Sequence, residues 1–294
     1  DVGMVTSYCP DGVAAYKLIL ESTANLRSVF YDMDTPVTLS RLEKGEAVPY
    51  VPAEGLEAFD LVLSYTGGEA IQRLKKELKA RRVAPLYGWV DQRIHSRVPA
   101  YSEFLADLSY LGTFAQDRQV ALETLLISAA REMPDKKFII AGAMYQNRES
   151  WPNNIRYFSH LSPPQHSAFY SSSPLTLSVT RGAMAVMGYC PSGRLFEAAA
   201  CGTAVLSDWW EGLDTFFEPG KEILTASTTN QAIAALMQDR RALEEIGSRA
   251  KQRALDCHTA EIRARRLIDL IETPVDESGA GAGLYEQSLV SRDA

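Results

Sequence analysis

The sequence predicts an α/β protein made of two Rossmann-like domains that face each other across a cleft. Three observations support this fold class. Short apolar segments that suit buried strands alternate with segments that suit helices along almost the whole chain. The alternation is interrupted once, by an irregular polar stretch over residues 88–106, and then restarts. The chain has 294 residues, which is enough for two domains of ordinary size.

These observations divide the chain into three parts. We expect an N-terminal domain over residues 1–103, a C-terminal domain over 104–275 and a mobile tail over 276–294, which is rich in glycine and acidic residues. The first seven residues already read as a strand that leads through Cys9-Pro10-Asp11-Gly12 into a helix. A chain that opens inside a βα unit suggests that upstream residues are missing.

The apolar periodicity places the expected elements. Strands are expected over residues 1–7, 27–31, 59–65, 82–87, 108–111, 137–141, 155–158, 175–179, 203–206 and 222–224. Helices are expected over residues 13–21, 38–44, 70–81, 119–132, 164–172, 230–238, 240–255 and 259–271. One more short helix is expected between Ser192, which suits an N-cap, and Gly202, which suits a C-terminal stop.

Composition and charge narrow the class of protein. A net charge of −7 argues against a nucleic-acid partner. No run of apolar residues is long enough for a membrane span, and no signal peptide is visible. The four cysteines have no metal-type spacing. A reduced, cytoplasmic protein is therefore expected.

The helix that follows Ser192 is the first candidate site. The N-terminus of a helix attracts anions, because its backbone N–H groups are unpaired and the helix dipole is positive there. Arg194 lies in the first turn and adds a positive charge. In an open α/β sheet, ligands bind beyond the carboxyl ends of the strands, where this helix begins. The sequence thus predicts an anion site near Arg194.

Three segments resemble a known family. They are Pro-Ser-Gly-Arg-Leu-Phe-Glu-Ala-Ala-Ala-Cys-Gly at 191–202, Trp-Glu-Gly-Leu-Asp at 210–214 and Glu-Pro-Gly-Lys-Glu-Ile-Leu at 218–224. They look like the donor-binding region of CgeB-type glycosyltransferases, GT-B-fold enzymes related to glycosyl transferase group 1. The segments 177–181 and 88–91 support the resemblance, which covers roughly residues 30–270. The family's first strand and glycine-rich loop have no counterpart here.

The resemblance implies transfer of a sugar from a nucleotide-diphosphate sugar to an unidentified acceptor, with no metal or other cofactor. In the relatives, two glutamates with seven residues between them serve the donor. Glu197 matches the second, which typically contacts the nucleotide ribose, whereas Tyr189 stands at the first. Further expected donor contacts are Gly112, Arg118, Arg181, Ser192, Gly193, Arg194, Glu211 and Gly212. Several of these residues also have a purely structural explanation: an ion pair for Glu197, Arg194 and Arg181, a helix cap for Ser192 and Gly193, and a tight turn for Gly112 and Arg118.

The expected catalytic residues are Asp32, Asp34 and His95. Asp32 and Asp34 form an Asp-x-Asp pair, which in GT-A enzymes binds a divalent metal. Because the alternation indicates GT-B, we expect them instead to form a wall of the acceptor pocket, with one of them as general base. The alternative is an ordinary turn at the end of a strand. His95 follows the interdomain segment and is either catalytic or structural.

Two other functions fit the same residues. A nucleotide-sugar epimerase on this fold would act without an acceptor. A non-catalytic protein that binds nucleotide-sugars or serves as a scaffold would explain the loss of the first glutamate, since it needs binding but no turnover.

Overall fold

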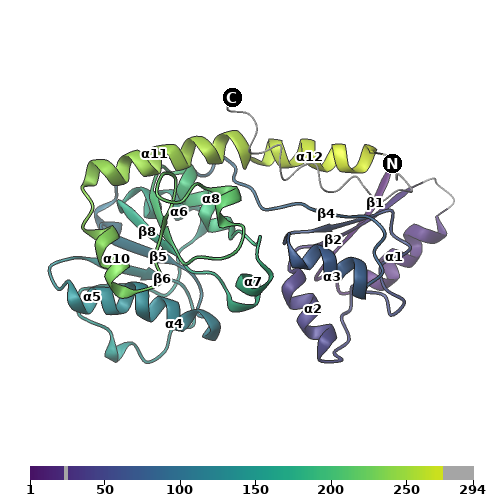
Figure 1. Cartoon of the computed structure of the whole chain (residues 1–294), viewed down its shortest axis with the longest axis horizontal. Coiled ribbons are helices and arrows are strands. Elements are labelled where there is room, and N and C mark those ends of the chain that lie inside the picture. Colours follow the sequence, from purple (N-terminus) through teal and green to yellow (C-terminus); the bar gives the residue numbers. More distant parts are fainter. Residues whose placement is uncertain (23–25, 274–294) are drawn as a thin grey trace. The chain divides into compact units, whose positions relative to one another are not determined.

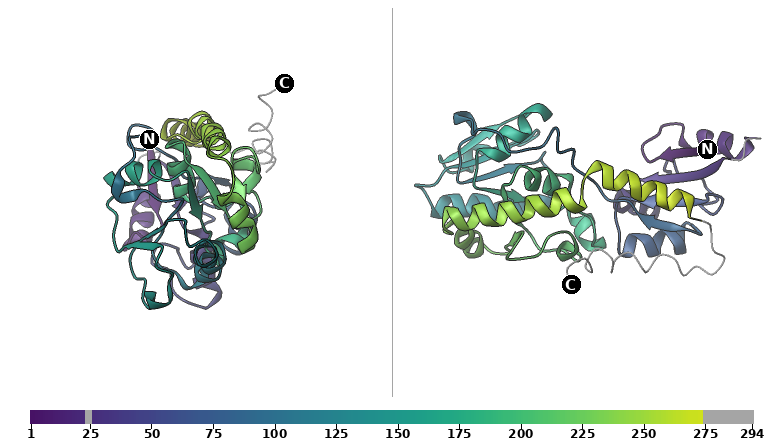
Figure 2. Two further views of the ribbon diagram at one scale, coloured as in Figure 1. Left: turned by 90° about the vertical axis from the view of Figure 1, so that its left-hand side faces the viewer. Right: turned by 90° about the horizontal axis from the view of Figure 1, so that it is seen from above.

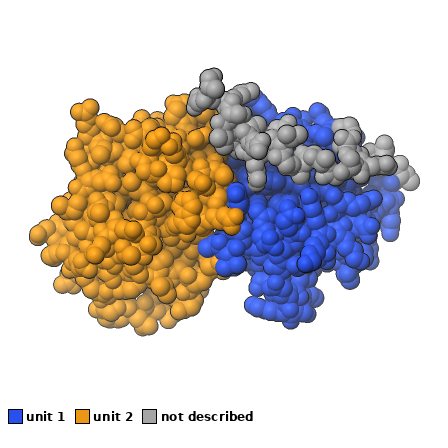
Figure 3. Space-filling model, viewed as in Figure 1, with its two compact units in different colours: residues 1–88, 183–191, 261–294 blue, residues 89–182, 192–260 orange. Residues whose placement is uncertain are grey.

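A computed structural model describes residues 1–22 and 26–273. They form two compact units, coloured separately in Figure 3. Unit 1 contains residues 1–88, 183–191 and 261–273, and unit 2 contains residues 89–182 and 192–260. The sequence-based division at residue 103 treats each domain as one continuous segment, whereas both units are assembled from separate segments. The expected tail over 276–294 lies outside the described residues.

Unit 1 is built on a parallel sheet with the strand order β1-β2-β3-β4. The strands are β1 (Val2–Thr6), β2 (Arg27–Asp32), β3 (Leu61–Ser64) and β4 (Val83–Pro85). The helices that follow them are α1 (Gly12–Glu21), α2 (Thr35–Glu43) and α3 (Glu69–Glu77). All neighbouring strands run the same way, as the alternation of strands and helices predicts.

The two faces of this sheet are covered by segments from opposite ends of the chain. On one face, Phe30 and Val62 pack in a core with Tyr16 of α1. On the other face, Val29 packs with Leu270 of α12 (Ala260–Glu272). Successive residues of β2 thus point to opposite faces, which is the period expected of a strand buried on both sides. Figure 1 shows α12 beside the strands of unit 1.

Unit 2 has a six-stranded parallel sheet with the order β10-β9-β8-β5-β6-β7. Its strands are β5 (Leu108–Leu111), β6 (Phe138–Ala141), β7 (Ile155–Phe158), β8 (Leu175–Ser178), β9 (Ala204–Ser207) and β10 (Leu224–Thr225). Read from β7 to β10, this is the doubly wound order 3-2-1-4-5-6. The direction of winding reverses between β5 and β8, and ligands bind at such a switch point.

Helices cover both faces of this sheet (Figures 1 and 2). On one face, α11 (Arg240–Cys257) contacts both α8 (Gly193–Ala200) and β9. On the other face, α10 (Thr229–Leu236) packs on α5 (Ser128–Glu132) and on the π-helical turn η3 (Glu123–Ile127), and shares a core with β5. The helices of unit 2 are α4 (Gln119–Leu122), η3 (Glu123–Ile127), α5 (Ser128–Glu132), α6 (His166–Ser171), α8 (Gly193–Ala200), α9 (Leu213–Phe216), α10 (Thr229–Leu236) and α11 (Arg240–Cys257). Short 3₁₀ turns are η1 (Ser102–Phe104), η2 (Gln116–Arg118), η4 (Arg148–Ser150) and η5 (Pro163–Gln165).

The structure confirms the type of the expected strands and helices, except that the helix expected over 119–132 is π-helical in its middle, over Glu123–Ile127. Three further differences concern bounds and short helices. The helix expected over 70–81 ends at Glu77, because Lys79 adopts a left-handed backbone with φ of 58°. The last strand is Leu224–Thr225 rather than 222–224. Two short helices were not expected, α7 (Gly182–Met187) and α9. Among the described residues, no helix is both long and apolar enough to cross a membrane.

Candidate functional site

Helix α8 presents the candidate site of unit 2. The Ser192 hydroxyl accepts a hydrogen bond from the Arg194 backbone N–H at 3.4 Å, as an N-cap does. Leu195 and Phe196 are at most 1% exposed and hold the helix against the core. At its other end, Gly202 has φ of 69°, which is the left-handed conformation that ends helices. Glu197 is thereby fixed one turn into the helix.

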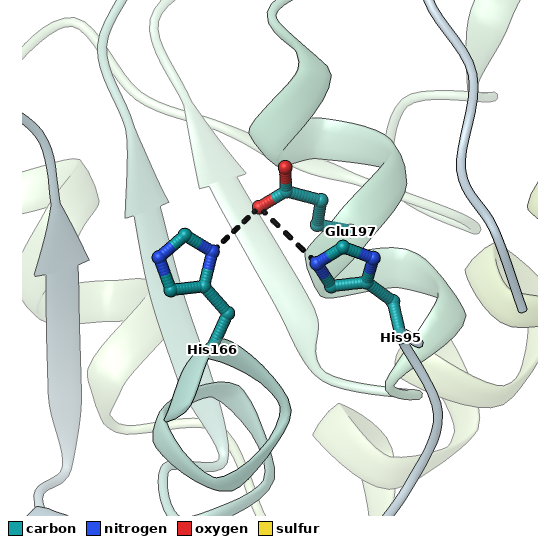
Figure 4. A group of neighbouring side chains, drawn as sticks. All are labelled: His95, His166 and Glu197. Atoms are coloured by element: carbon teal, nitrogen blue, oxygen red, sulfur yellow. Dashed lines mark ion pairs between the residues drawn. The ribbon is translucent and has the colours of Figure 1, made fainter. Parts of the chain in front are cut away.

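Glu197 lies next to two histidines (Figure 4). Its Oε2 atom is 3.4 Å from Nδ1 of His166 and 3.9 Å from Nε2 of His95. The three side chains come from α8, from the first residue of α6 and from the loop that follows β4. They are mostly buried, with exposed fractions of 14% for His95, 18% for His166 and 23% for Glu197. The sequence predicted His95 and Glu197 as site residues, and the structure brings them together.

Serine hydroxyl groups on and beside α6 hold the His95 loop in place. The Ser167 hydroxyl donates to the backbone carbonyl of Ile94 at 2.8 Å. Farther along, the backbone N–H of Val98 donates to the hydroxyl of Ser171 at 3.2 Å, and that of Tyr101 donates to Ser172 at 2.9 Å. Because these bonds flank His95, its ring is positioned by the same helix that carries His166.

Charge and burial act in opposite directions on Glu197. Burial raises the pKa of this carboxyl group, but the His166 ring, with His95 and Arg194 adding to it, outweighs burial and lowers the pKa below its ordinary value. Burial lowers the pKa of His95, which the Glu197 charge only partly opposes. A charged Glu197 therefore sits beside a neutral His95. Neither ring nitrogen of His95 has a hydrogen-bond partner among the described residues.

The predicted arginines differ in what they contact. Nε of Arg181 lies 3.5 Å from Asp117, and the same carboxylate accepts from the backbone N–H of Gly182 at 2.9 Å. Nη2 of Arg118 donates to the backbone carbonyl of Thr113 at 2.7 Å. The Arg194 guanidinium, by contrast, forms no ion pair with an acidic side chain within 1–22 and 26–273, although its charge helps to lower the pKa of Glu197.

Gly112, Glu211 and Gly212 lie in loops that follow strands, whereas Gly193 is the first residue of α8. Gly112 follows β5 at the switch point, and a Cβ atom there would lie 2.5 Å from the Tyr110 hydroxyl oxygen, so a larger residue would require the buried Tyr110 ring to shift. Gly212, with φ of 87°, is the N-cap of α9. Glu211 beside it is exposed to solvent. The loops after β5, β8 and β9 thus carry Gly112, Arg118, Arg181, Glu211 and Gly212.

Asp32 and Asp34 lie in unit 1, in the turn between β2 and α2. Asp32 is fully buried, and its Oδ1 atom accepts from the Asp34 backbone N–H and the Thr38 hydroxyl, each at 3.1 Å. Its Oδ2 atom has no partner among the described residues. Burial raises the pKa of Asp32 to about 6, although those hydrogen bonds oppose it. Asp34 accepts from the Tyr8 hydroxyl at 2.7 Å.

A protein-family comparison matches residues 118–269, slightly more than half of the chain, to a family described as glycosyl transferase-like. The chain belongs to this family. A comparison with curated protein sequences finds no match for this glycosyl transferase-like protein. The matched region contains α8 and the loops that carry most of the predicted donor contacts. The finer assignment to the CgeB type stays a prediction.

Solved structures similar to this glycosyl transferase-like protein share its fold. A sucrose-phosphate synthase from Thermosynechococcus elongatus has 15% identity and a TM-score of 0.64, over 88% of this chain and 70% of its own. HepE of Anabaena has 14% identity and a TM-score of 0.65, over 91% and 78%. The trehalose-6-phosphate synthase OtsA has 10% identity and a TM-score of 0.65, over 93% and 72%. The fold of this protein is therefore GT-B.

The sequence did not single out His166 as a site residue. It stands 31 positions before Glu197, and no spacing rule links the two. The only available signal was its place at the start of a helix that follows a strand, which puts it at the carboxyl edge of the same sheet.

Proposed function

We propose that this protein transfers a sugar from a nucleotide-diphosphate sugar to an acceptor. Family membership and the GT-B fold support the proposal, and HepE of Anabaena was solved with UDP-glucose and with UDP and glucose. The observation that carries it is the arrangement on α8. A capped helix start at Ser192, the guanidinium of Arg194, which forms no ion pair among the described residues, and the carboxylate of Glu197 follow one another within the first one and a half turns.

In this proposal unit 2 binds the donor. The diphosphate lies near Ser192, Gly193 and Arg194, where backbone N–H groups, the helix dipole and a planar guanidinium favour a dianion. Glu197 accepts hydrogen bonds from the ribose hydroxyls. The loops after β5 and β8, with Gly112, Arg118 and Arg181, and the loop after β9, with Glu211 and Gly212, contact the rest of the donor.

The chemistry follows from the charge that develops when the sugar leaves. Negative charge grows on the departing diphosphate, and Arg194 with the start of α8 stabilises it more strongly in the transition state than in the ground state. A general base must take the proton of the acceptor hydroxyl. Asp32, Asp34 and His95 are the proposed candidates. The pKa of about 6 at Asp32 is near neutral pH, which suits a general base.

A second candidate function is nucleotide-sugar binding without turnover. It is favoured by Tyr189, which stands where the relatives carry a carboxylate. The backbone of Tyr189 has φ of 46°, and its carbonyl accepts from the Gly67 N–H at 2.9 Å. This residue therefore shapes a turn within unit 1, and its side chain offers no carboxylate to the donor.

Nucleotide binding tests the donor site directly. UDP, GDP, ADP and their sugars are titrated calorimetrically in the presence of EDTA, and the thermal shift is recorded in parallel. We expect one nucleotide class to bind. Glu197→Ala and Arg194→Ala should each weaken it by about 10-fold or more, since a hydrogen bond to a charged group contributes about 1.5–3 kcal/mol. Glu245→Ala and Arg241→Ala, which break an exposed ion pair of α11, are the matched controls.

Each outcome separates the candidates. If no nucleotide binds the wild type, or if both α8 variants bind it normally, the proposed donor site is wrong. If nucleotide binds but no diphosphate is released with any acceptor in a panel of sugars, lipids and peptides, binding without turnover replaces transfer as the preferred function.

A further inference from the structure

The cluster of His95, His166 and Glu197 has the composition of a metal centre. Each residue offers one ligand atom, and these three atoms all lie within 4.8 Å of one another. Imidazole nitrogen and carboxylate oxygen are ligands that zinc accepts, and two histidines with one glutamate form a known type of catalytic zinc site. Figure 4 shows both imidazole rings directed toward the same carboxylate oxygen of Glu197.

Two of the three separations are close to those of a bound cation. Ligand atoms bonded at about 2.0–2.1 Å to tetrahedral zinc lie about 3.3 Å from one another. The His166–Glu197 separation is 3.4 Å and the His95–Glu197 separation is 3.9 Å. The ligand nitrogens of His95 and His166 lie within 4.8 Å of each other, so the two rings move closer together when one ion contacts all three atoms.

His95 also offers ligand atoms that the described part of the protein does not use. The unpartnered nitrogens of His95 are unusual, because buried polar atoms are nearly always hydrogen-bonded. A metal ion would use one of them.

The surroundings hold the ligands before any ion arrives. Tyr170 is buried, and its hydroxyl donates toward Oε2 of Glu197 at 3.5 Å. The serine contacts from α6 fix the His95 loop at both ends. Such outer contacts orient metal ligands and strengthen binding.

We propose that His95, His166 and Glu197 bind a divalent transition-metal ion, with zinc preferred, and leave a fourth position for water or another ligand. This site belongs to unit 2 and is distinct from the Asp-x-Asp pair, since Asp32 and Asp34 belong to unit 1. It goes beyond the proposed transferase function, although it shares Glu197 with the proposed ribose contact. Hard cations such as Mg²⁺ prefer all-oxygen ligands and should bind poorly here.

Titration of the full chain with metal alone tests the site. The protein is prepared without a polyhistidine tag, stripped with EDTA and desalted, and ZnCl₂ is added in a calorimeter without nucleotide. We expect one zinc ion per chain and no measurable binding of Mg²⁺. His95→Gln, His166→Gln and Glu197→Gln should each weaken zinc binding by at least about 10-fold, since losing even an outer partner costs about 10–100-fold. His160→Gln, at an exposed histidine outside the cluster, is the matched control.

A second measurement covers variants that fold poorly. X-ray absorption of the zinc-loaded wild type should show nitrogen and oxygen ligands with histidine scattering and no sulfur. The proposal is overturned if wild type binds no stoichiometric zinc, if the three variants bind it like His160→Gln, or if the spectrum shows thiolate ligands. Because zinc is titrated without nucleotide and nucleotide is titrated with EDTA, the metal site and the donor site can each fail while the other stands.

Discussion

At the scale of single residues, Asp32 has an unequal environment around its two oxygen atoms. Two donors reach Oδ1, and none among the described residues reaches Oδ2. Full burial then disfavours the charged form, and the pKa rises to about 6 from an ordinary value of 3.8. The carboxyl group is thus more easily protonated in the folded protein than in the unfolded chain.

This difference predicts how stability changes with pH. The pKa of Asp32 is higher in the folded protein than in the unfolded chain, so the native state takes up the proton at a higher pH. The contribution of Asp32 to the free energy of unfolding is therefore greatest below the unfolded pKa and is lost as the pH rises through about 6. Between pH 7 and pH 5, wild type should therefore gain about 1 kcal/mol of unfolding free energy relative to Asp32→Asn. Urea unfolding of both proteins at several pH values measures this.

The comparison with Asp32→Asn cancels the titration of groups that do not interact with Asp32. The asparagine side-chain carbonyl can keep both hydrogen bonds that Oδ1 accepts. If the two proteins lost or gained stability in parallel between pH 5 and pH 7, or if Asp32→Asn gained on wild type as the pH fell, the raised pKa would be wrong.

At the scale of elements, α11 approaches unusually close to the loop after α8. A Cβ atom built on Gly247 would lie 2.4 Å from the carbonyl oxygen of Gly202 and 3.0 Å from the backbone nitrogen of Ala204. These neighbours are backbone atoms, so they cannot rotate away as a side chain would. Helix α11 packs on both α8 and β9, so the close approach at Gly247 holds α11 next to the helix of the candidate site.

Gly247→Ala therefore tests which of two effects dominates. Helix propensity favours alanine over glycine by about 1 kcal/mol. The clash with backbone should cost more, and we expect a net loss of about 1–3 kcal/mol of unfolding free energy. Chemical denaturation followed by circular dichroism measures it. Ser248→Ala, at an exposed position of the same helix, should be neutral or slightly stabilising, and equal behaviour of the two variants would refute the close approach.

The predictability of these elements differs for physical reasons. Apolar periodicity located the strands and main helices because burial on a sheet leaves a regular pattern in the sequence. It did not locate α7 or the early end of α3, which depend on local backbone geometry such as the left-handed Lys79. Glu197 could be placed on its helix from Ser192 and Gly202. Its contact with His166 could not, because the register between two helices is decided by tertiary packing.

At the scale of the whole molecule, each unit is completed by segments distant in the sequence. The buried Arg263 of α12 donates from Nε to the backbone carbonyls of Tyr87 and Gly88, each at 3.2 Å. The Arg82 guanidinium donates to the carbonyl of Leu270. The last described helix is thus attached to the end of β4, within a unit that begins at residue 1. The sequence-based boundary assigns this helix to the C-terminal domain because it comes after that domain along the chain. The helix instead packs on an apolar face of the sheet in unit 1.

Leu270→Ala tests whether α12 stabilises unit 1. Leu270 is 7% exposed and packs with Val29 and Leu63 in one core cluster. Removing its side chain should cost about 2–5 kcal/mol through lost burial and the cavity left behind. Because the contacts lie within unit 1, native-state hydrogen exchange should accelerate for amides of β2 and β3 and stay unchanged for those of β8 and β9. Ile268→Ala, at a residue of the same helix that is 51% exposed, should change neither set. Faster exchange confined to unit 2, or equal effects of the two variants, would show that α12 does not serve as part of the N-terminal unit.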